Sequence, residues 1–129
     1  DVIGDFIDIA NKKYANESVE FIESDVSLKS AHSPYRIGEK FDVAIATGVA
    51  GNIGGPASHP KSLNRFLKHM YDSANLVMVN FPSVHATSRA KNIEYFSPEY
   101  LISSALVITN NVKLIHGNMA DILLILGKV

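Results

Sequence analysis

The chain has 129 residues, of which 47% are apolar and 19% are charged, so its composition is that of a globular domain and excludes a disordered segment. The net charge is -1 with lysine and arginine scattered, so nothing in the sequence indicates a nucleic-acid footprint or a polybasic membrane patch. There are no cysteines, which excludes disulfides, thiolate metal sites and a cysteine nucleophile. We therefore expect one cytoplasmic domain over residues 1–129, with no membrane or nucleic-acid partner.

The first predicted element is an amphipathic helix that follows Asp1. Its apolar face consists of Ile3, Phe6, Ile7, Ala10 and Tyr14, at helical spacing. Asp1 stands where a strand would end before this helix. In a doubly wound sheet, an acid in that position binds the ribose hydroxyls of a nucleotide. The next predicted element is a short strand, Val19–Glu23, which ends at Ser24 and Asp25.

The middle of the chain alternates between a strand, a loop and a helix. Asp42–Ala46 is nearly continuously apolar, which is typical of a parallel strand covered on both faces. Residues 47–59 form a loop rich in glycine and proline. Pro60 then suits the first position of a helix. The core-facing stripe of that helix is Leu63, Phe66, Leu67, Met70 and Tyr71.

The last part of the chain predicts a strand, a helix and a hairpin. The strand Leu76–Asn80 is stopped by Pro82. Ser97 is a good N-cap for a helix that runs to about Leu106, since Pro98 suits its first turn. The strands Val112–His116 and Ile122–Leu126 are joined by a short turn, so they must be antiparallel. Alternating strands and helices predict an α/β fold.

Four segments, taken in order, resemble the class I S-adenosylmethionine-dependent methyltransferases. The segments are Asp1 with Phe6–Tyr14, Val19–Val26, Phe41–Val49 and Tyr95–Leu101, followed by the terminal hairpin. The resemblance covers almost the whole chain. It implies a doubly wound, mostly parallel, Rossmann-like sheet into which the last strand inserts antiparallel.

The resemblance also implies a cofactor, S-adenosylmethionine, and roles for particular residues. Asp1 would bind the ribose hydroxyls, and Asp25 would accept a hydrogen bond from the adenine amino group, with the Val26 backbone beside the ring. The methionine part would lie against the end of the fourth family strand, at Ala46, Thr47 and Gly48. The methyl acceptor is expected to be a small molecule that the sequence does not identify.

Two features depart from the family pattern. The family's first strand, its glycine-rich turn and the following helix are missing before Asp1, so we expect the domain to be incomplete at its N-terminus. That strand is central in the family, and a partner chain could replace it, which leaves a homo-oligomer open. The loop after the fourth family strand also holds an unusual insertion, Gly51–Pro56.

The same loop supports a competing hypothesis. Thr47–Gly54 fits the T-G-x-x-G-x-x-G fingerprint of extended short-chain dehydrogenases and follows a strand, which would make the chain an NAD(P)-binding oxidoreductase. Against it, Pro56 and Pro60 interrupt the helix that should open there, and the next strand ends at Asn80 instead of an acid. A non-enzymatic domain with a methyltransferase-like fold is the third alternative.

Two histidines are candidates for a general base. His59 and His85 lie in loops after successive strands, on the side where substrate enters, and an imidazole can accept a proton near neutral pH. A surface position without a catalytic role is the alternative for each. His69 and His116 are expected to be structural. The five histidines show no ligand spacing, so we expect no metal site.

Overall fold

The computed structural model describes residues 4–16, 18–22, 40–52 and 61–128. The chain divides into two compact units, Asp1–Gly38 and Glu39–Val129, and each is described here by itself. The single domain expected over residues 1–129 stays a prediction. No helix among the described residues is long and apolar enough to cross a membrane.

The first unit contains the predicted amphipathic helix. Helix α1 spans Gly4–Lys13, and the Tyr14 ring lies 5.7 Å from that of Phe21. The strand predicted at Val19–Glu23 is wrong over Val19–Ile22, which have no regular secondary structure. A strand requires a neighbour to take its backbone hydrogen bonds, and none of the described strands pairs with this segment.

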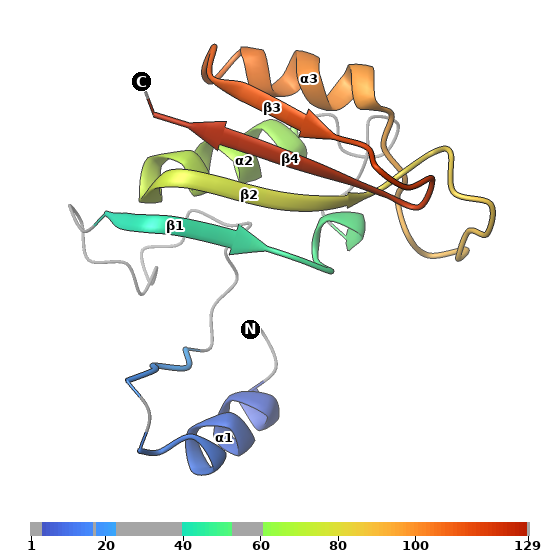
Figure 1. Ribbon diagram of the computed structural model, residues 1–129. Coiled ribbons are helices and arrows are strands. Elements are labelled where there is room, and N and C mark those ends of the chain that lie inside the picture. Colours follow the sequence, from blue (N-terminus) through green and yellow to red (C-terminus); the bar gives the residue numbers. More distant parts are fainter. Residues whose placement is uncertain (1–3, 17, 23–39, 53–60, 129) are drawn as a thin grey trace. The chain divides into compact units, whose positions relative to one another are not determined.

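The second unit is built on a four-stranded open sheet (Figure 1). Its strands are β1 (Phe41–Ala46), β2 (Ala74–Pro82), β3 (Val112–Ile115) and β4 (Asp121–Gly127), in the spatial order β1-β2-β4-β3. A 3-10 turn η1 (Ala50–Asn52) follows β1, helix α2 (Ser62–Ser73) precedes β2, and helix α3 (Pro98–Leu106) precedes β3.

The sheet is mixed. Strands β1 and β2 are parallel, whereas β4 is antiparallel to both β2 and β3. The arrowheads of β1, β2 and β3 therefore point one way and that of β4 the other (Figure 1). The antiparallel terminal hairpin is confirmed. A mostly parallel sheet is not observed, because inserting β4 between β2 and β3 makes two of the three described pairings antiparallel.

The central place of β4 follows from its sequence. Ile122, Leu124 and Leu126 are fully buried on one face, and the alternate residues Leu123 and Ile125 are half-buried on the other. A strand that is apolar on both faces is typical of the interior of a sheet. Three buried pairs form across β2 and β4: Val77 with Leu126, Val79 with Leu124, and Phe81 with Ile122.

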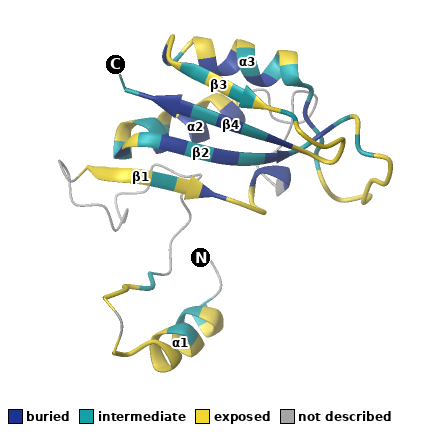
Figure 2. Ribbon diagram, viewed as in Figure 1, coloured by how far each residue is buried: buried dark blue, intermediate teal, exposed yellow. Residues whose placement is uncertain are grey.

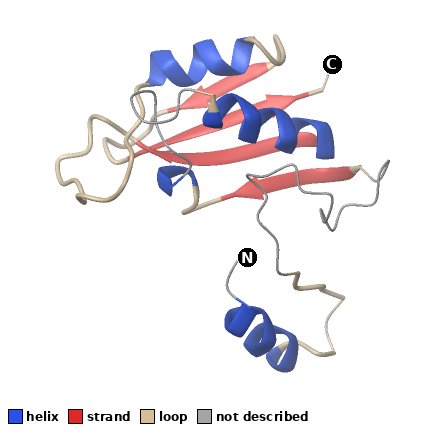
Figure 3. Cartoon of the chain, turned by 180° about the vertical axis from the view of Figure 1, so that it is seen from behind, coloured by secondary structure: helices blue, strands red, loops and turns tan. Residues whose placement is uncertain are grey.

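Helices α2 and α3 pack on the same face of the sheet (Figure 3). The core lies between this helical layer and the buried faces of β2 and β4, which are dark in Figure 2. A doubly wound sheet has helices on both faces. The described helices of this unit do not form that arrangement, so the prediction of a doubly wound sheet is not borne out there.

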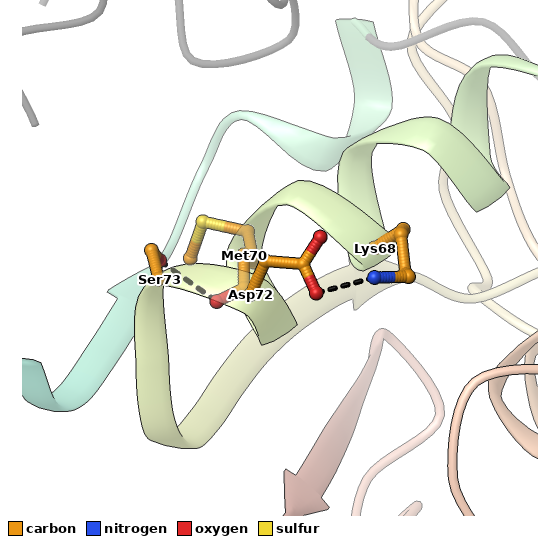
Figure 4. A network of polar contacts seen from close by, with 4 residues as sticks. All are labelled: Lys68, Met70, Asp72 and Ser73. Atoms are coloured by element: carbon orange, nitrogen blue, oxygen red, sulfur yellow. Dashed lines mark hydrogen bonds and ion pairs between the residues drawn. The ribbon is translucent and has the colours of Figure 1, made fainter. Parts of the chain in front are cut away.

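Helix α2 buries four of the five residues of its predicted stripe, while Tyr71 is half-buried, and the helix ends in two local interactions. Leu63, Phe66 and Leu67 are fully buried, and Met70 is nearly so. Lys68 forms an ion pair with Asp72 one turn later, and the Ser73 hydroxyl donates to the Met70 carbonyl at 2.8 Å (Figure 4). Bonding of this kind satisfies a carbonyl that the helix end leaves without an intrahelical partner.

Strand β1 differs from its sequence-based expectation. It was expected to be covered on both faces, yet Phe41, Val43 and Ile45 are 42%, 45% and 66% exposed. The strand lies at the edge of the described sheet and pairs only with β2. Its apolar side chains at alternate positions therefore face away from the helical layer.

Candidate functional site

The carboxyl ends of three strands meet at one edge of the sheet. Because β1, β2 and β3 run in the same direction, the segments that follow Ala46, Pro82 and Ile115 lie at the same end (Figure 1). In open α/β sheets, ligands bind outside the carboxyl ends of the strands. This edge is the candidate functional site.

The segment after β1 contains three of the predicted cofactor-binding residues. Ala46 is 8% exposed and pairs with Val79 of β2, whereas Thr47 and Gly48 are exposed. Gly48 has a φ of +72°, a left-handed conformation that favours glycine. A Cβ added there would meet no atom within 4 Å, so the space beside this backbone is open.

Gly51 is glycine for a different physical reason. It is buried in η1, and a Cβ there would lie 2.5 Å from Cγ2 of Ile93 and 3.3 Å from Cγ of Pro82. The Glu94 backbone N–H donates to the Gly51 carbonyl at 2.9 Å. Gly51 therefore lets the loop after β1 pack against the loop after β2.

A polar cluster of Ser83, His85 and His116 lies at the end of β2, and Ser83 contacts both histidines. It is fully buried, and its Oγ lies 3.0 Å from Nε2 of His116 and accepts from the backbone N–H of His85 at 3.1 Å. The backbone N–H of Ser83 donates to the Ala120 carbonyl at 2.8 Å. These bonds join the ends of β2 and β3 to the start of β4.

The two histidines of this cluster lie side by side. The ring centroids of His85 and His116 are 5.6 Å apart; His85 is exposed, and His116 is half-buried. The Ser83 hydroxyl oxygen accepts a hydrogen bond from the His85 backbone N–H, so the Ser83 hydroxyl proton is available for His116. The Ser83 hydroxyl can donate this proton to Nε2 of His116 when the His116 ring carries its own proton on Nδ1. His85 has an accessible imidazole at the edge of the sheet, and its role as a base stays a prediction.

Glu99 adds a carboxylate in the first turn of α3. Its own backbone N–H and the Ser97 side chain hold the pKa of Glu99 below its ordinary value, with His85 and His116 contributing in the same direction. Ser97 caps this helix by accepting from the Tyr100 backbone N–H at 3.2 Å, as the sequence predicted. The Glu99 carboxylate is thus close enough to the imidazoles of His85 and His116 to interact with them electrostatically.

The structure brings some predicted site residues to this edge and leaves others undescribed. Ala46, Thr47, Gly48 and His85 lie at the carboxyl ends of β1 and β2. Four predicted residues lie outside the described residues: Asp1, Asp25, Val26 and His59. Among the residues that the structure describes, no three histidine, cysteine, aspartate or glutamate side chains could hold a metal ion.

The sequence analysis missed the contact between Ser83 and His116. Serine after a strand is a common turn residue, and His116 was expected to be structural. The contact depends on strand order, since β2 and β3 flank β4 and their carboxyl ends lie at the same edge of the sheet. The only local signal was Ser83 directly after Pro82 at the end of an apolar strand.

Comparison with known proteins gives no relative from which a function could be taken. No protein-family model matches the chain, and no curated protein or solved structure matches it.

Proposed function

We propose that the chain is a class I S-adenosylmethionine-dependent methyltransferase domain that transfers a methyl group to a small-molecule acceptor. The observation that carries the proposal is the position of β4. It is the last of the described strands in sequence, yet it lies between β2 and β3 and is antiparallel to both, while the other three described strands share one direction. The resemblance implies this insertion of the last strand.

The free edge of β1 is consistent with the same fold. In the family, a central first strand is the shared neighbour of the second and fourth strands, and β1 corresponds to the fourth. Within the described part of the chain, β1 pairs only with β2 and exposes Phe41, Val43 and Ile45. An additional strand on the outer edge of β1 would extend the sheet beside this strand.

Two features at the end of β1 support S-adenosylmethionine as the proposed cofactor. Open space beside Gly48 and the exposed backbone of Thr47 allow a ligand to approach the end of β1 closely. Ala46, Thr47 and Gly48 would contact the methionine part. We propose Asp1 for the ribose hydroxyls, and Asp25 with Val26 for the adenine, by the resemblance.

The chemistry needs little from the protein beyond position. S-adenosylmethionine, when bound, supplies an electrophilic methyl group on a sulfonium. The residues of this chain would hold an acceptor in line with that methyl group and exclude water. Where the acceptor must lose a proton, His85 or His59 would take it as a neutral imidazole.

The oxidoreductase alternative gains no support from Gly51. In that hypothesis, the glycines of Thr47–Gly54 let the backbone approach a pyrophosphate. Gly51 instead is buried against Ile93 and Pro82, and the first α-helix described after the loop begins at Ser62.

Calorimetric titration of the full-length gene product with S-adenosylmethionine, S-adenosylhomocysteine and NAD tests the proposal. We expect the first two to bind and NAD not to bind. Asp1→Ala should abolish the binding, whereas Asp8→Ala, which removes the same charge from an exposed position of α1, should leave it unchanged. Tight NAD binding would favour the oxidoreductase, and no binding of any of the three would favour a non-enzymatic domain.

A further inference from the structure

The loop between β2 and α3 is fixed at its base. The Val84 backbone N–H donates to the Phe96 carbonyl at 3.0 Å, and the Phe96 N–H donates to the Pro82 carbonyl at 2.8 Å. The bond from Glu94 to Gly51 ties the same loop to the segment that contains Gly48. Residues 85–95 therefore belong to the edge of the sheet at which the candidate site lies.

Arg89 is held on an aromatic ring within this loop. Its guanidinium carbon lies 5.5 Å from the centroid of the Tyr95 ring, which is a cation–π distance. The Tyr95 hydroxyl oxygen accepts from the Ala90 backbone N–H at 2.7 Å, which fixes the ring to the loop. The guanidinium is thus restrained before any ligand arrives, which lowers the entropy cost of binding.

No described residue accepts a hydrogen bond from the Arg89 guanidinium. The side chain is exposed, and none of the carboxylates in the described part of the chain forms an ion pair with it. Lys91, two residues later, is also exposed, and the one acid between Val84 and Tyr95 is the half-buried Glu94. Glu99 lies near His85 and His116, so its negative charge disfavours an anion at the histidines.

We propose that Arg89, restrained by Tyr95, binds an anionic group of the methyl acceptor, so that the acceptor is a carboxylate- or phosphate-bearing small molecule. This inference rests on the proposed methyl transfer, but the anion site stands on its own geometry. A planar guanidinium donates two parallel hydrogen bonds to a carboxylate or phosphate, which gives both affinity and orientation. Lys91 adds a second positive charge on the same loop.

Nuclear magnetic resonance titration of the full chain tests the site. The Nε–Hε signal of Arg89 and the backbone amides of residues 85–95 are followed while inorganic phosphate or acetate is added at constant ionic strength, with chloride as the reference anion. We expect a saturable shift confined to these signals. Arg89→Gln should weaken binding about tenfold, the loss of one charge-assisted contact. Arg65→Gln, which removes the same charge from an exposed position on α2, should change it less than about twofold.

Two further variants distinguish the effect of the restrained, bidentate guanidinium from the effect of its positive charge alone. Arg89→Lys keeps the charge but loses the bidentate geometry, and Tyr95→Leu keeps Arg89 but removes its platform; both should weaken binding. Saturation with phosphate alone would identify a phosphate-bearing acceptor, and saturation with acetate alone would identify a carboxylate. Equal weakening by Arg65→Gln and Arg89→Gln, or shifts that chloride reproduces, would overturn the proposal.

The titration contains no S-adenosylmethionine, so its failure is distinguishable from failure of the proposed function. If the anions do not bind while the cofactor does, the inference about Arg89 is wrong and methyl transfer stands. If the anions bind at Arg89 while the cofactor does not bind, the assignment of the anion to a methyl acceptor is overturned.

Discussion

Replacing Gly51 by alanine should destabilise the second unit, because the side chains of Ile93 and Pro82 leave no space for an added methyl group. The new Cβ would lie 2.5 Å from Cγ2 of Ile93, whereas carbon atoms in ordinary contact are about 3.5 to 4.0 Å apart. The Ile93 side chain must therefore move by about 1 Å. The Ile93 side chain is 40% exposed and can turn toward water, which limits the free-energy cost. Pro82, whose Cγ would lie 3.3 Å from the new Cβ, is part of β2 and cannot move in this way.

We expect the free energy of unfolding to fall by about 1 to 3 kcal/mol, the usual cost of overpacking. For a unit of this size, that lowers Tm by roughly 4 to 24 °C. Urea unfolding followed by far-UV circular dichroism measures the change. Gly117→Ala is the matched control, since a Cβ there meets no atom within 4 Å and its φ is ordinary, and it should have an effect within about 0.5 kcal/mol.

The double variant Gly51→Ala/Ile93→Ala decides whether the contact with Ile93 is the cause. Truncating Ile93 removes the atom that the new Cβ meets, so the two substitutions together should cost less than the sum of each alone. Simple additivity, or a Gly51→Ala protein as stable as the parent, would refute the packing explanation. Gly51 could then again be assigned to a ligand.

Three more changes probe the core, a helix cap and a titratable group. Phe81→Ala should cost about 3 to 5 kcal/mol in urea unfolding, because Phe81 is fully buried with its ring edge-on to Phe96 at 5.1 Å; a loss below about 1 kcal/mol would mean that this core is not closely packed. Ser97→Ala should cost about 1 kcal/mol by removing the N-cap of α3, and Ser97→Asp, which can still accept from Tyr100, should restore most of it. Glu99→Gln should destabilise the protein at neutral pH, because the carboxylate is the form that the Glu99 backbone N–H and Ser97 favour and its pKa is lowered. That stability is present above the unfolded-state pKa and lost as the pH falls through the folded-state pKa, so parent and variant should converge in acid; a difference that is independent of pH would contradict the assignment.

The elements that were predicted well are those specified by local sequence. The stripe from Leu63 to Met70 identifies α2, and the Ser97-Pro98 pair identifies the start of α3. The short turn after His116 forces the hairpin to be antiparallel. Each signal lies within a few residues of the element it specifies, so no knowledge of the remaining fold was needed.

The predictions that failed depended on partners distant in the sequence. Val19–Ile22 has the composition of a strand, but a strand exists only where another supplies its hydrogen bonds. The apolar run of β1 correctly predicted a strand and wrongly predicted cover on both faces, since apolar composition does not reveal which neighbours are present. The contact between Ser83 and His116 could not be predicted from the sequence, because it depends on strand order.

The position of β4 also sets the order in which the sheet can form during synthesis. Its residues leave the ribosome after those of β1, β2 and β3, yet Pro82 pairs with Asp121 and Leu76 with Gly127. Until β4 has emerged, the nascent chain has one edge of β2 and all of β3 without their native partner. Such unpaired edges are sites of mispairing between chains. Folding of this unit is therefore expected to finish only once β4 has been made.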